Sequence, residues 1–473
     1  MSRPSQKPDA VLVGVHLPGV TDHEFDSSME ELERLVSTLG YRALVRVTQA
    51  RSHIDAAAVL GEGKLKELGG LTGGDGVVGS PAPKKKDKAR LRRAAEEGAD
   101  ATNDSDANDD EEDREHDRED RGDDRRSAAS EARAALVAVD HDLSPSQARN
   151  LERATGARVL DRTGVIIEIF HRHAKSREAR LQVEIARLAY TAPRLRESPG
   201  GKERQRGRGA GEAALELDRR KIRDRIAELR EELAAVQRDQ DVRRAHRRQA
   251  PRVALVGYTN AGKSSLMRAL TGSEVYVEDK LFATLDTTVR VLQPETRPRI
   301  LVSDTVGFIK KLPHDLVASF KSTLDEALEA SHLLHVVDAA DPSWPSQLEV
   351  TRDVLQEIGA GDVPSTLVMN KIDRLAPEDL HALRVRLPHA WFVSAHDPAD
   401  VARARDRLIA IFDAMYAEAE IVVPYDRQAV LSEMHEAGRV ADERYDESGV
   451  TVHFRADPET IARVRSLLAR SRP

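Results

Sequence analysis

The sequence predicts a multidomain α/β protein. A P-loop nucleotide domain is expected to follow an α/β N-terminal domain and a helical hairpin, and to precede a small α/β C-terminal domain. Three observations support this fold class. Short apolar strands alternate with amphipathic helices, a coiled-coil seam interrupts them, and a Gly-rich GxxxxGKS loop follows a buried strand. The 473 residues suffice for about three domains.

The composition excludes several classes of protein. The chain has no cysteine, which rules out disulfides, cysteine zinc sites and thiol catalysis and fits a reducing compartment. Residues 1–20 lack a signal-peptide core, and no apolar run is long enough for a membrane helix, so we expect a cytoplasmic protein with no membrane association. At face value, the net charge of −8 argues against a nucleic-acid partner.

The N-terminal domain is expected at residues 1–170, where strand and helix patterns alternate. Apolar runs predict strands at 11–15, 43–47, 134–139 and 158–160, and helical spacing predicts helices at 29–39, 56–68 and 144–154. The last of these helices begins at a capping signal, Ser144-Pro145. Gly61-Glu62-Gly63-Lys64 resembles a phosphate loop only superficially, because it lacks the preceding buried strand and the GxxxxGK spacing.

A charged insertion at about 70–130 interrupts this domain. Residues 84–93 carry a net charge of +6 and residues 96–124 a net charge of −13. Such a segment cannot form a core, so we expect disorder. We interpret it as a solvated loop. The alternative is an electrostatic decoy that competes with RNA for basic surfaces of the same protein.

Residues 171–250 predict a basic antiparallel helical hairpin. One arm has apolar residues at helical spacing, and the other shows the 4-3-4-3 spacing of a coiled-coil seam. The first set is Leu181, Ile185 and Leu188, and the second is Ile222, Ile226, Leu229, Leu233 and Val236. Between them, residues 194–211 are rich in Gly and Arg and form the predicted tip. The net charge of +9 over 172–250 predicts contact with RNA phosphates.

The domain expected at 251–418 carries the chemistry. An apolar strand at 252–256 runs into a phosphate loop and then an amphipathic helix. The loop is Gly257-Tyr258-Thr259-Asn260-Ala261-Gly262-Lys263-Ser264-Ser265. Its backbone N–H groups can surround the β-phosphate at the positive end of the helix. We expect Lys263 to contact the β- and γ-phosphates and the Ser264 hydroxyl to bind Mg²⁺.

Further elements follow in the order that a guanine-nucleotide switch requires. A strand at 300–303 ends in Asp304-Thr305-Val306-Gly307. Asp304 is expected to hold Mg²⁺ through a water, and the Gly307 N–H to reach the γ-phosphate. After the next strand, at 333–337, a strand at 366–369 leads into Asn370-Lys371-Ile372-Asp373. A strand at 391–393 leads into Ser394-Ala395-His396.

The last two motifs select the base. The Asp373 carboxylate can accept both donors on the Watson–Crick edge of guanine, which adenine does not offer. Lys371 is expected over the base, Asn370 to tie this loop to the phosphate loop, and the Ala395 N–H to meet guanine O6. The motifs occur in register over about 140 residues, each at a strand end, and together predict a P-loop GTPase domain.

The first switch is expected at residues 281–288, between the phosphate loop and Asp304. A threonine there would bind Mg²⁺ only when GTP is present, and spacing alone does not choose among Thr284, Thr287 and Thr288. Hydrolysis would proceed by in-line attack of water on the γ-phosphate. Phe308 stands where many GTPases place a water-orienting Gln, so we expect slow intrinsic hydrolysis that depends on a partner.

These motifs together resemble the HflX family of bacterial GTPases. The resemblance rests on GYTNAGKSSL, FATLDTT, DTVGFI, NKID and SAH, and upstream on His141–Gln147, Leu160–Gly164 and Leu181–Glu184. It covers nearly the whole chain apart from the insertion. By resemblance, Thr284 is the first-switch threonine, and Phe308 fits a family that lacks the Gln. One departure lies in the hairpin loop, where Ala210 replaces the Pro and Ala213 replaces the Thr of the family's GPGET motif.

The combined assignment is as follows. The catalytic residues are Lys263, Thr284 and Gly307, and the Mg²⁺ ligands are Ser264, Thr284 and, through water, Asp304. GTP or GDP is expected to contact the phosphate loop, Phe282, Ala283, Thr284, Leu285, Asp286, Asp304, Thr305, Val306, Gly307, Asn370, Lys371, Ile372, Asp373, Ser394, Ala395 and His396.

The resemblance implies a ribosome-associated GTPase. Members of the family bind the large ribosomal subunit, both RNA and proteins, through the N-terminal domain and the hairpin. When GTP-loaded, they split stalled or idle ribosomes. We expect a monomer. Two alternatives are a signalling GTPase with a protein effector, and ATP-dependent RNA remodelling by the N-terminal domain, where no second full phosphate loop occurs.

The remaining segment, 419–473, has strand–helix–strand–helix signals with strands at 421–423 and 450–454 and helices at 428–437 and 458–468. We expect a small α/β accessory domain without catalytic residues.

The net charge of the chain is distributed unevenly along the sequence. Without residues 96–124 it is +5, so the value of −8 averages segments of opposite sign and says little against an RNA partner.

Overall fold

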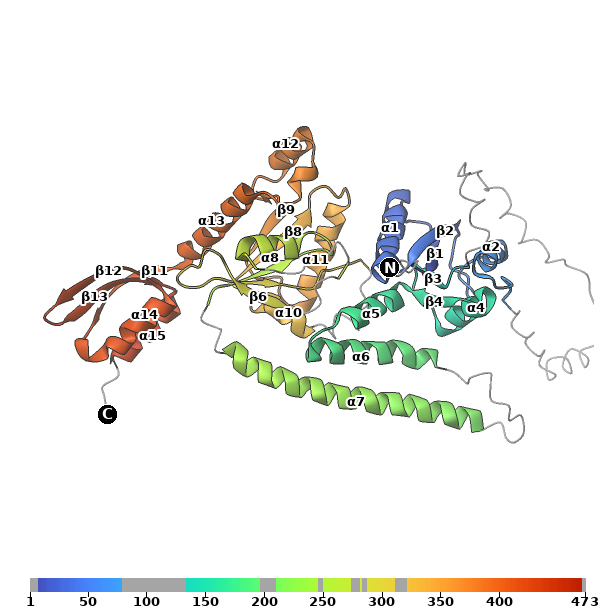
Figure 1. The fold of residues 1–473 in the computed structure, drawn as a ribbon, viewed down its shortest axis with the longest axis horizontal. Helices are drawn as coiled ribbons and strands as arrows, with labels where there is room; N and C mark the ends of the chain where they lie inside the picture. The colour runs from blue at the N-terminus through green and yellow to red at the C-terminus, as the bar shows by residue number, and fades with distance from the viewer. Residues whose placement is uncertain are drawn as a thin grey trace, which may run out of the picture. The chain divides into compact units, whose positions relative to one another are not determined.

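The computed structural model describes residues 7–78, 133–195, 210–245, 250–273, 281–282, 287–310 and 321–469. It confirms the predicted α/β fold class (Figure 1). The chain divides into two compact units, Met1–Arg162 and Thr163–Pro473. Most of the insertion expected at about 70–130, and residues 196–209 of the hairpin tip predicted at 194–211, lie outside the described residues. The ends of that tip are described: Arg194 closes a short 3-10 turn, and α7 begins at Ala210.

The first unit contains a four-stranded parallel sheet of order β2-β1-β3-β4. Its strands are β1 (Asp9–His16), β2 (Arg42–Ala50), β3 (Leu136–Val139) and β4 (Arg158–Asp161). Its helices are α1 (Asp22–Thr38), α2 (Glu62–Thr72) and α4 (Pro145–Thr155). The Ser144 side chain caps α4 in a capping box with Gln147, as the sequence signal predicted.

One predicted helix in this unit begins later than expected. The helix predicted at 56–68 starts at Glu62, with Gly61 as its N-cap. Upstream, Asp55 and Val59 form an isolated bridge, and the Asp55 carboxylate accepts hydrogen bonds from two backbone N–H groups. This local side-chain bonding competes with helix formation, which explains the later start.

The second unit begins with three helices, α5 (Arg162–His173, shared at its first residue), α6 (Arg177–Thr191) and α7 (Ala210–Ala245). The domain boundary expected at residue 170 therefore lies inside α5. The helices α6 and α7 pack through Leu181, Ile185 and Leu229, with Leu188, Ile226, Leu233 and Val236 around them. These are the side chains of the predicted seam, apart from Ile222.

A six-stranded sheet of order β10-β9-β8-β5-β7-β6 forms the centre of the domain that the sequence predicts to be a GTPase. Its strands are β5 (Arg252–Val256), β6 (Thr288–Val291), β7 (Leu301–Asp304), β8 (His332–Asp338), β9 (Ser365–Asn370) and β10 (Trp391–Phe392). All neighbours are parallel except β6 and β7. Parallel strands end at one edge, so the predicted motifs are gathered there.

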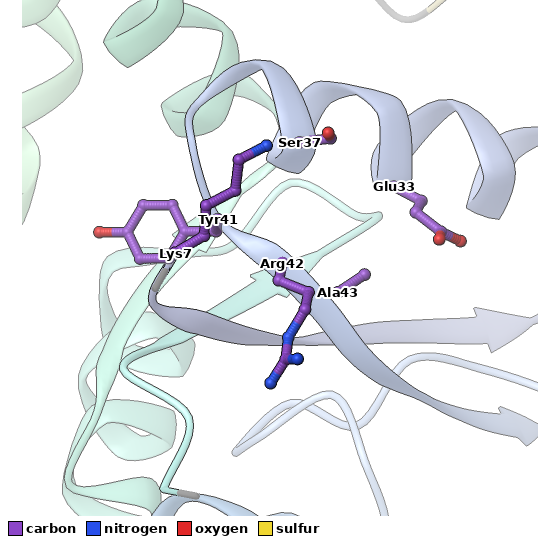
Figure 2. A pocket seen from close by; sticks show the side chains of 6 residues that line it. All are labelled: Lys7, Glu33, Ser37, Tyr41, Arg42 and Ala43. Carbon is purple, nitrogen blue, oxygen red and sulfur yellow. The ribbon is translucent and has the colours of Figure 1, made fainter. Parts of the chain in front are cut away.

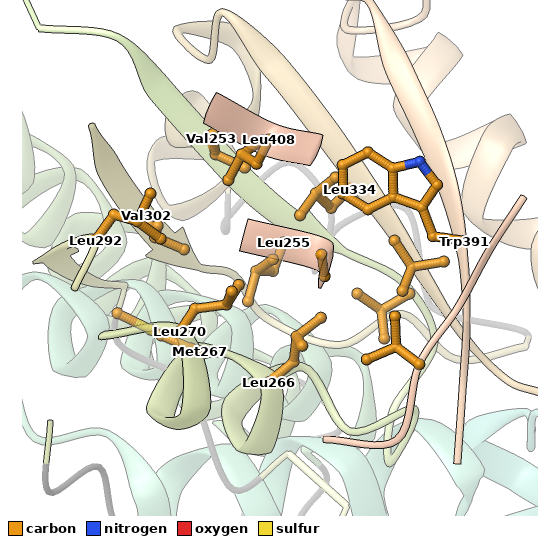
Figure 3. Close-up of a cluster of buried hydrophobic side chains, with 14 of the residues drawn as sticks. Val253, Leu255, Leu266, Met267, Leu270, Leu292, Val302, Leu334, Trp391 and Leu408 are labelled. Carbon is orange, nitrogen blue, oxygen red and sulfur yellow. The ribbon is translucent and has the colours of Figure 1, made fainter. Parts of the chain in front are cut away.

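Helices cover both faces of this sheet. On one face, α8 (Lys263–Thr271) and α13 (Pro398–Met415) contribute to the apolar cluster that contains Leu266, Trp391 and Leu408 (Figure 3). On the other face, Ala327 of α10 (Lys321–Leu328) and Leu355 of α11 (Trp344–Ile358) pack against Ala254. A short helix, α12 (Pro377–Arg386), follows β9. The sheet is therefore buried on both faces, which fits its continuous apolar strands.

The C-terminal region has one strand more than the sequence predicts. It forms a three-stranded antiparallel sheet of order β11-β13-β12, with α14 (Gln428–Ala437) and α15 (Pro458–Ala469). The strands are β11 (Ala417–Val423), β12 (Arg439–Asp446) and β13 (Gly449–Ala456). The missed strand, β12, is mostly exposed and polar, so it lacks the alternation that marks a strand. Among the described residues, none of the helices combines the length and apolarity needed to cross a bilayer.

A buried ionic cluster joins the carboxyl edge of the first sheet to α1. Arg162, directly after β4, donates from Nη1 to Asp140 Oδ1 at 2.7 Å and from Nη2 to Glu31. The Ser28 hydroxyl donates to the other Asp140 oxygen at 2.7 Å. The side chains of Arg162 and Asp140 are each 2% exposed, so neither charge can be compensated by water. The unit therefore depends on this cluster keeping all its members.

We predict that Arg162→Met lowers the free energy of unfolding of the first unit by about 3–5 kcal/mol, because two carboxylates stay buried without their cation. The control is Arg46→Met, whose partner Glu33 is 44% exposed. It should cost less than about 1 kcal/mol. Amide hydrogen exchange of residues 9–161 in increasing urea measures both. Equal destabilisation by the two variants would contradict the prediction.

Candidate functional site

The phosphate loop connects β5 to α8 in a conformation that demands its glycines. Gly257 has a φ of +149°, and a Cβ there would lie 2.1 Å from the Val336 carbonyl oxygen. Gly262 has a φ of +92°, and a Cβ there would lie 2.3 Å from the Asn370 side-chain nitrogen. Both positions combine a left-handed backbone with close approach to a neighbouring strand or loop. The loop therefore curls tightly at the N-terminus of α8, where backbone N–H groups attract anions.

Lys263 lies at the first position of α8 and is almost fully buried. Its Nζ donates to the Gly257 carbonyl at 3.0 Å and to the Tyr258 carbonyl at 2.8 Å. Burial lowers the pKa of Lys263 to about 8, and this effect outweighs the opposite influence of Asp304. A phosphate beside Nζ would favour the charged ammonium. The phosphate loop thus holds a buried amine whose charged form a bound phosphate would stabilise.

Ser264 and Asp304 form the pair that could hold Mg²⁺. The Ser264 hydroxyl donates to Asp304 Oδ2 at 2.6 Å, and Asp304 is fully buried at the end of β7. Hydroxyl and carboxylate oxygens suit Mg²⁺, which in phosphate sites takes its remaining ligands from phosphates and water. The described residues contain no group of three or more His, Asp or Glu side chains arranged for a metal. The donor set therefore fits a cation that arrives with a nucleotide.

The segment after β7 lies directly over the phosphate loop. A Cβ at Gly307 would be 2.8 Å from Thr259 Cα and 3.0 Å from Lys263 Nζ, so only glycine fits. The Thr259 hydroxyl is buried and makes no hydrogen bond to any described residue. An unsatisfied buried hydroxyl in the phosphate loop is consistent with a site that receives phosphate oxygens. By contrast, the Thr305 hydroxyl donates to the Leu255 carbonyl at 2.7 Å, which directs it into the sheet.

Phe308 is fixed by its backbone to the phosphate loop. Its N–H donates to the Gly257 carbonyl at 3.1 Å, and its carbonyl accepts from the Thr259 N–H at 2.7 Å. The ring is 2% exposed and belongs to the apolar cluster with Ala254 and Val256. A ring in this cluster cannot orient an attacking water. Slow intrinsic hydrolysis remains a prediction.

Asn370 connects three loops at the carboxyl edge of the sheet. Its Nδ2 donates to the Ala261 carbonyl in the phosphate loop at 2.9 Å. Its Oδ1 accepts from the Ala395 N–H at 3.2 Å. The neighbouring residue Lys371 has a φ of 60° and donates from Nζ to the Asn260 carbonyl and to Asp338 Oδ2, both at 2.7 Å. Asn370 and Lys371 thus hold the NKID and SAH loops against the phosphate loop.

The carboxylate expected to read the base is held by a serine. Asp373 Oδ1 accepts from the Ser394 hydroxyl at 2.6 Å, and this bond lowers the pKa of Asp373. The same hydroxyl accepts from the His396 N–H at 3.3 Å. Asp373 is therefore ionised at neutral pH and oriented, which is the state that can accept hydrogen bonds from guanine. Ile372 lies in the short turn between Lys371 and Asp373.

Two supporting carboxylates were not predicted. Asp400 Oδ2 accepts from the Ser394 N–H at 2.9 Å and fixes the SAH loop. Asp338, at the end of β8, pairs with Lys371. Its place at a strand end on the motif edge was the signal that could have identified it. Asp400 lies inside a helix without any pattern that distinguishes it.

The first switch is described only at its two ends. Ala283, Thr284, Leu285 and Asp286 lie outside the described residues, and their roles remain predictions. Thr287 precedes β6 and Thr288 begins it. Phe282 is 3% exposed, and its ring contacts Phe170 with centroids 4.6 Å apart. The structure therefore places this ring against an aromatic neighbour on α5.

The first unit has a separate pocket lined by Lys7, Glu33, Ser37, Tyr41, Arg42 and Ala43 (Figure 2). It lies where β2 begins and α1 ends, at the amino edge of the sheet. Arg42 is paired with Asp9 at 2.7 Å. Ligands of parallel α/β sheets bind at the carboxyl edge, and a helix C-terminus disfavours phosphate. This pocket therefore does not favour the ATP alternative.

Three family models match the chain. A "GTP-binding GTPase N-terminal" model matches residues 26–77 and 121–171, and a "GTP-binding GTPase Middle Region" model matches 173–247. A "50S ribosome-binding GTPase" model matches 252–371.

Known proteins extend these matches over nearly the full length. GTPase HflX of Gluconacetobacter diazotrophicus is 61% identical over 98% of each chain. GTPase HflX of Caldanaerobacter subterraneus is 35% identical over 98% of this chain and 94% of its own. A GTP-binding protein from Sulfolobus solfataricus, solved with GDP, is 20% identical over 85% of this chain and 98% of its own. Its TM-score of 0.41 is too low to bear on function. The protein therefore belongs to the HflX family of GTPases.

Proposed function

We propose that the protein is a GTP-hydrolysing switch that binds the large ribosomal subunit and dissociates stalled or idle ribosomes. The observation that supports the ribosomal part is a set of exposed arginines on α7 that form no ion pair with a residue described in the structure. The name of the family model that matches the GTPase domain, a 50S ribosome-binding GTPase, supports the same partner. A ribosomal partner places the protein in the cytoplasm, and we infer that it acts as a monomer.

The nucleotide half of the proposal follows from the site. Lys263 and the Gly307 N–H would contact the γ-phosphate, and Thr284 would join them in the GTP state. Mg²⁺, held by Ser264 and through water by Asp304, would neutralise charge on the β- and γ-phosphates. These residues position the nucleotide. Phe308 lies in an apolar cluster and offers no polar side chain to orient the attacking water. A bound partner is therefore expected to accelerate turnover.

We predict that Asp373→Asn lowers GTP affinity by about a hundredfold or more, because two hydrogen bonds to a carboxylate are each worth about 1.5–3 kcal/mol. The variant should gain affinity for xanthosine triphosphate, whose C2 carbonyl can accept from the new amide. Fluorescent-nucleotide titration measures both affinities.

The matched control is Asp397→Asn, which makes the same change at the N-cap of α13. It should leave the preference for GTP over xanthosine triphosphate in place. Unchanged GTP affinity in Asp373→Asn, or no gain with xanthosine triphosphate, would contradict the role of Asp373.

The cations between residues 219 and 230 of α7 fall into two groups. Lys221, Arg223 and Arg225 pair with Asp218, Glu216 and Glu228 at 3.1, 2.7 and 2.9 Å. Arg219, Arg220 and Arg230 are exposed and form no ion pair with a residue that the structure describes. Cations without an acidic partner can neutralise RNA phosphates without first breaking an ion pair. The unpaired group is therefore the predicted contact with ribosomal RNA.

We predict that replacing Arg219, Arg220 and Arg230 by Gln weakens large-subunit binding and lowers the slope of log affinity against log salt by about three. The matched control replaces Lys221, Arg223 and Arg225 by Gln, which removes the same charge. It should have a smaller effect on both quantities. Salt-dependent titration with labelled subunits measures them. Equal effects, or binding without salt dependence, would favour a protein effector instead.

A further inference from the structure

Phe282 is buried although it lies in the segment that forms the first switch. Leu281 and Phe282 are 4% and 3% exposed. The φ of Phe282 is 57°, a left-handed value that is rare for a bulky residue. Such a conformation persists only when surrounding contacts hold it. The packing around the Phe282 ring must therefore supply the restraint.

The restraint comes from α5. The rings of Phe170 and Phe282 meet edge to face, with an interplanar angle of 82° and centroids 4.6 Å apart. This is a favourable aromatic geometry. Phe170 is 1% exposed, and its helix neighbours Ile166, Ile167 and Ile169 are also buried. The ring of Phe282 thus contacts the last turn of α5, a helix whose residues 164–167, 169 and 170 are buried.

That helix leads directly into the hairpin. Only residues 174–176 separate the end of α5 at His173 from the start of α6 at Arg177. Ala174 is buried, and its carbonyl accepts from Arg180 Nε at 3.3 Å. The Ser176 side chain caps α6. A change in the end of α5 would therefore be passed to α6, which packs against α7 through Leu229.

We propose that Phe282 couples the nucleotide state to the hairpin: its ring is seated on Phe170 with GDP and withdrawn with GTP. The proposal rests on the proposed function, in which Thr284 moves to the nucleotide in the GTP state. Two residues span at most about 7 Å, so Thr284 can reach only positions within that distance of Phe282, and a nucleotide contact beyond it requires Phe282 to move. The left-handed backbone at Phe282 favours release, because withdrawal lets it relax.

The test is amide hydrogen exchange of the free, full-length protein, saturated with either GDP or a non-hydrolysable GTP analogue. Exchange around Phe170 in α5 should be several-fold faster with the analogue. In Phe282→Gly, which removes the ring while tolerating a positive φ, this nucleotide dependence should disappear. Phe170→Leu perturbs the same contact from the other side and should reduce the dependence.

The control is Phe412→Leu, which alters a buried aromatic in the core cluster around Trp391 and should retain the dependence. Equal α5 exchange in both nucleotides, or a dependence that survives in both Phe282→Gly and Phe170→Leu, would overturn the coupling. No ribosome is present, so this outcome is distinguishable from a failure of ribosome binding, which would leave the α5 exchange unaffected.

Discussion

The side-chain amide of Asn370 is the interaction on which the nucleotide site depends. It is almost fully buried, donates to the phosphate loop at Ala261 and accepts from the SAH loop at Ala395. Because each partner is a backbone group, the amide fixes the positions of the loops themselves. The phosphate loop, the NKID loop and the SAH loop are thereby held in one geometry, while Asp373 and Lys263 provide charge.

Much of this arrangement could be predicted from the sequence, because each motif follows an apolar strand and parallel strands end at one edge. The helix cap at Ser144 was predicted from a local signal and is present. The features that were not predicted depend on contacts between residues far apart in the sequence, or on a strand whose residues do not alternate between apolar and polar. The polar strand β12 has no alternation, Arg162 finds Glu31 across 131 positions, and Phe170 and Phe282 meet only in the fold.

The net charge of the whole chain does not describe the charge of its separate segments. The chain carries a net charge of −8, yet α7 presents exposed arginines that have no acidic partner among the described residues. In the nucleotide site, by contrast, Lys263, Ser264 and Asp373 each form a hydrogen bond within the protein. The nucleotide site is thus preorganised by internal hydrogen bonds, while these arginines of α7 stay exposed to solvent.

The most direct test of the account is cosedimentation of the full-length protein with large ribosomal subunits, with GDP or a non-hydrolysable GTP analogue. The account predicts that more protein sediments with the subunits when the analogue is bound, and that Lys263→Ala abolishes this difference. Equal binding in the two nucleotides, absent binding in both, or a nucleotide difference that survives in Lys263→Ala would contradict a GTP-controlled ribosomal switch.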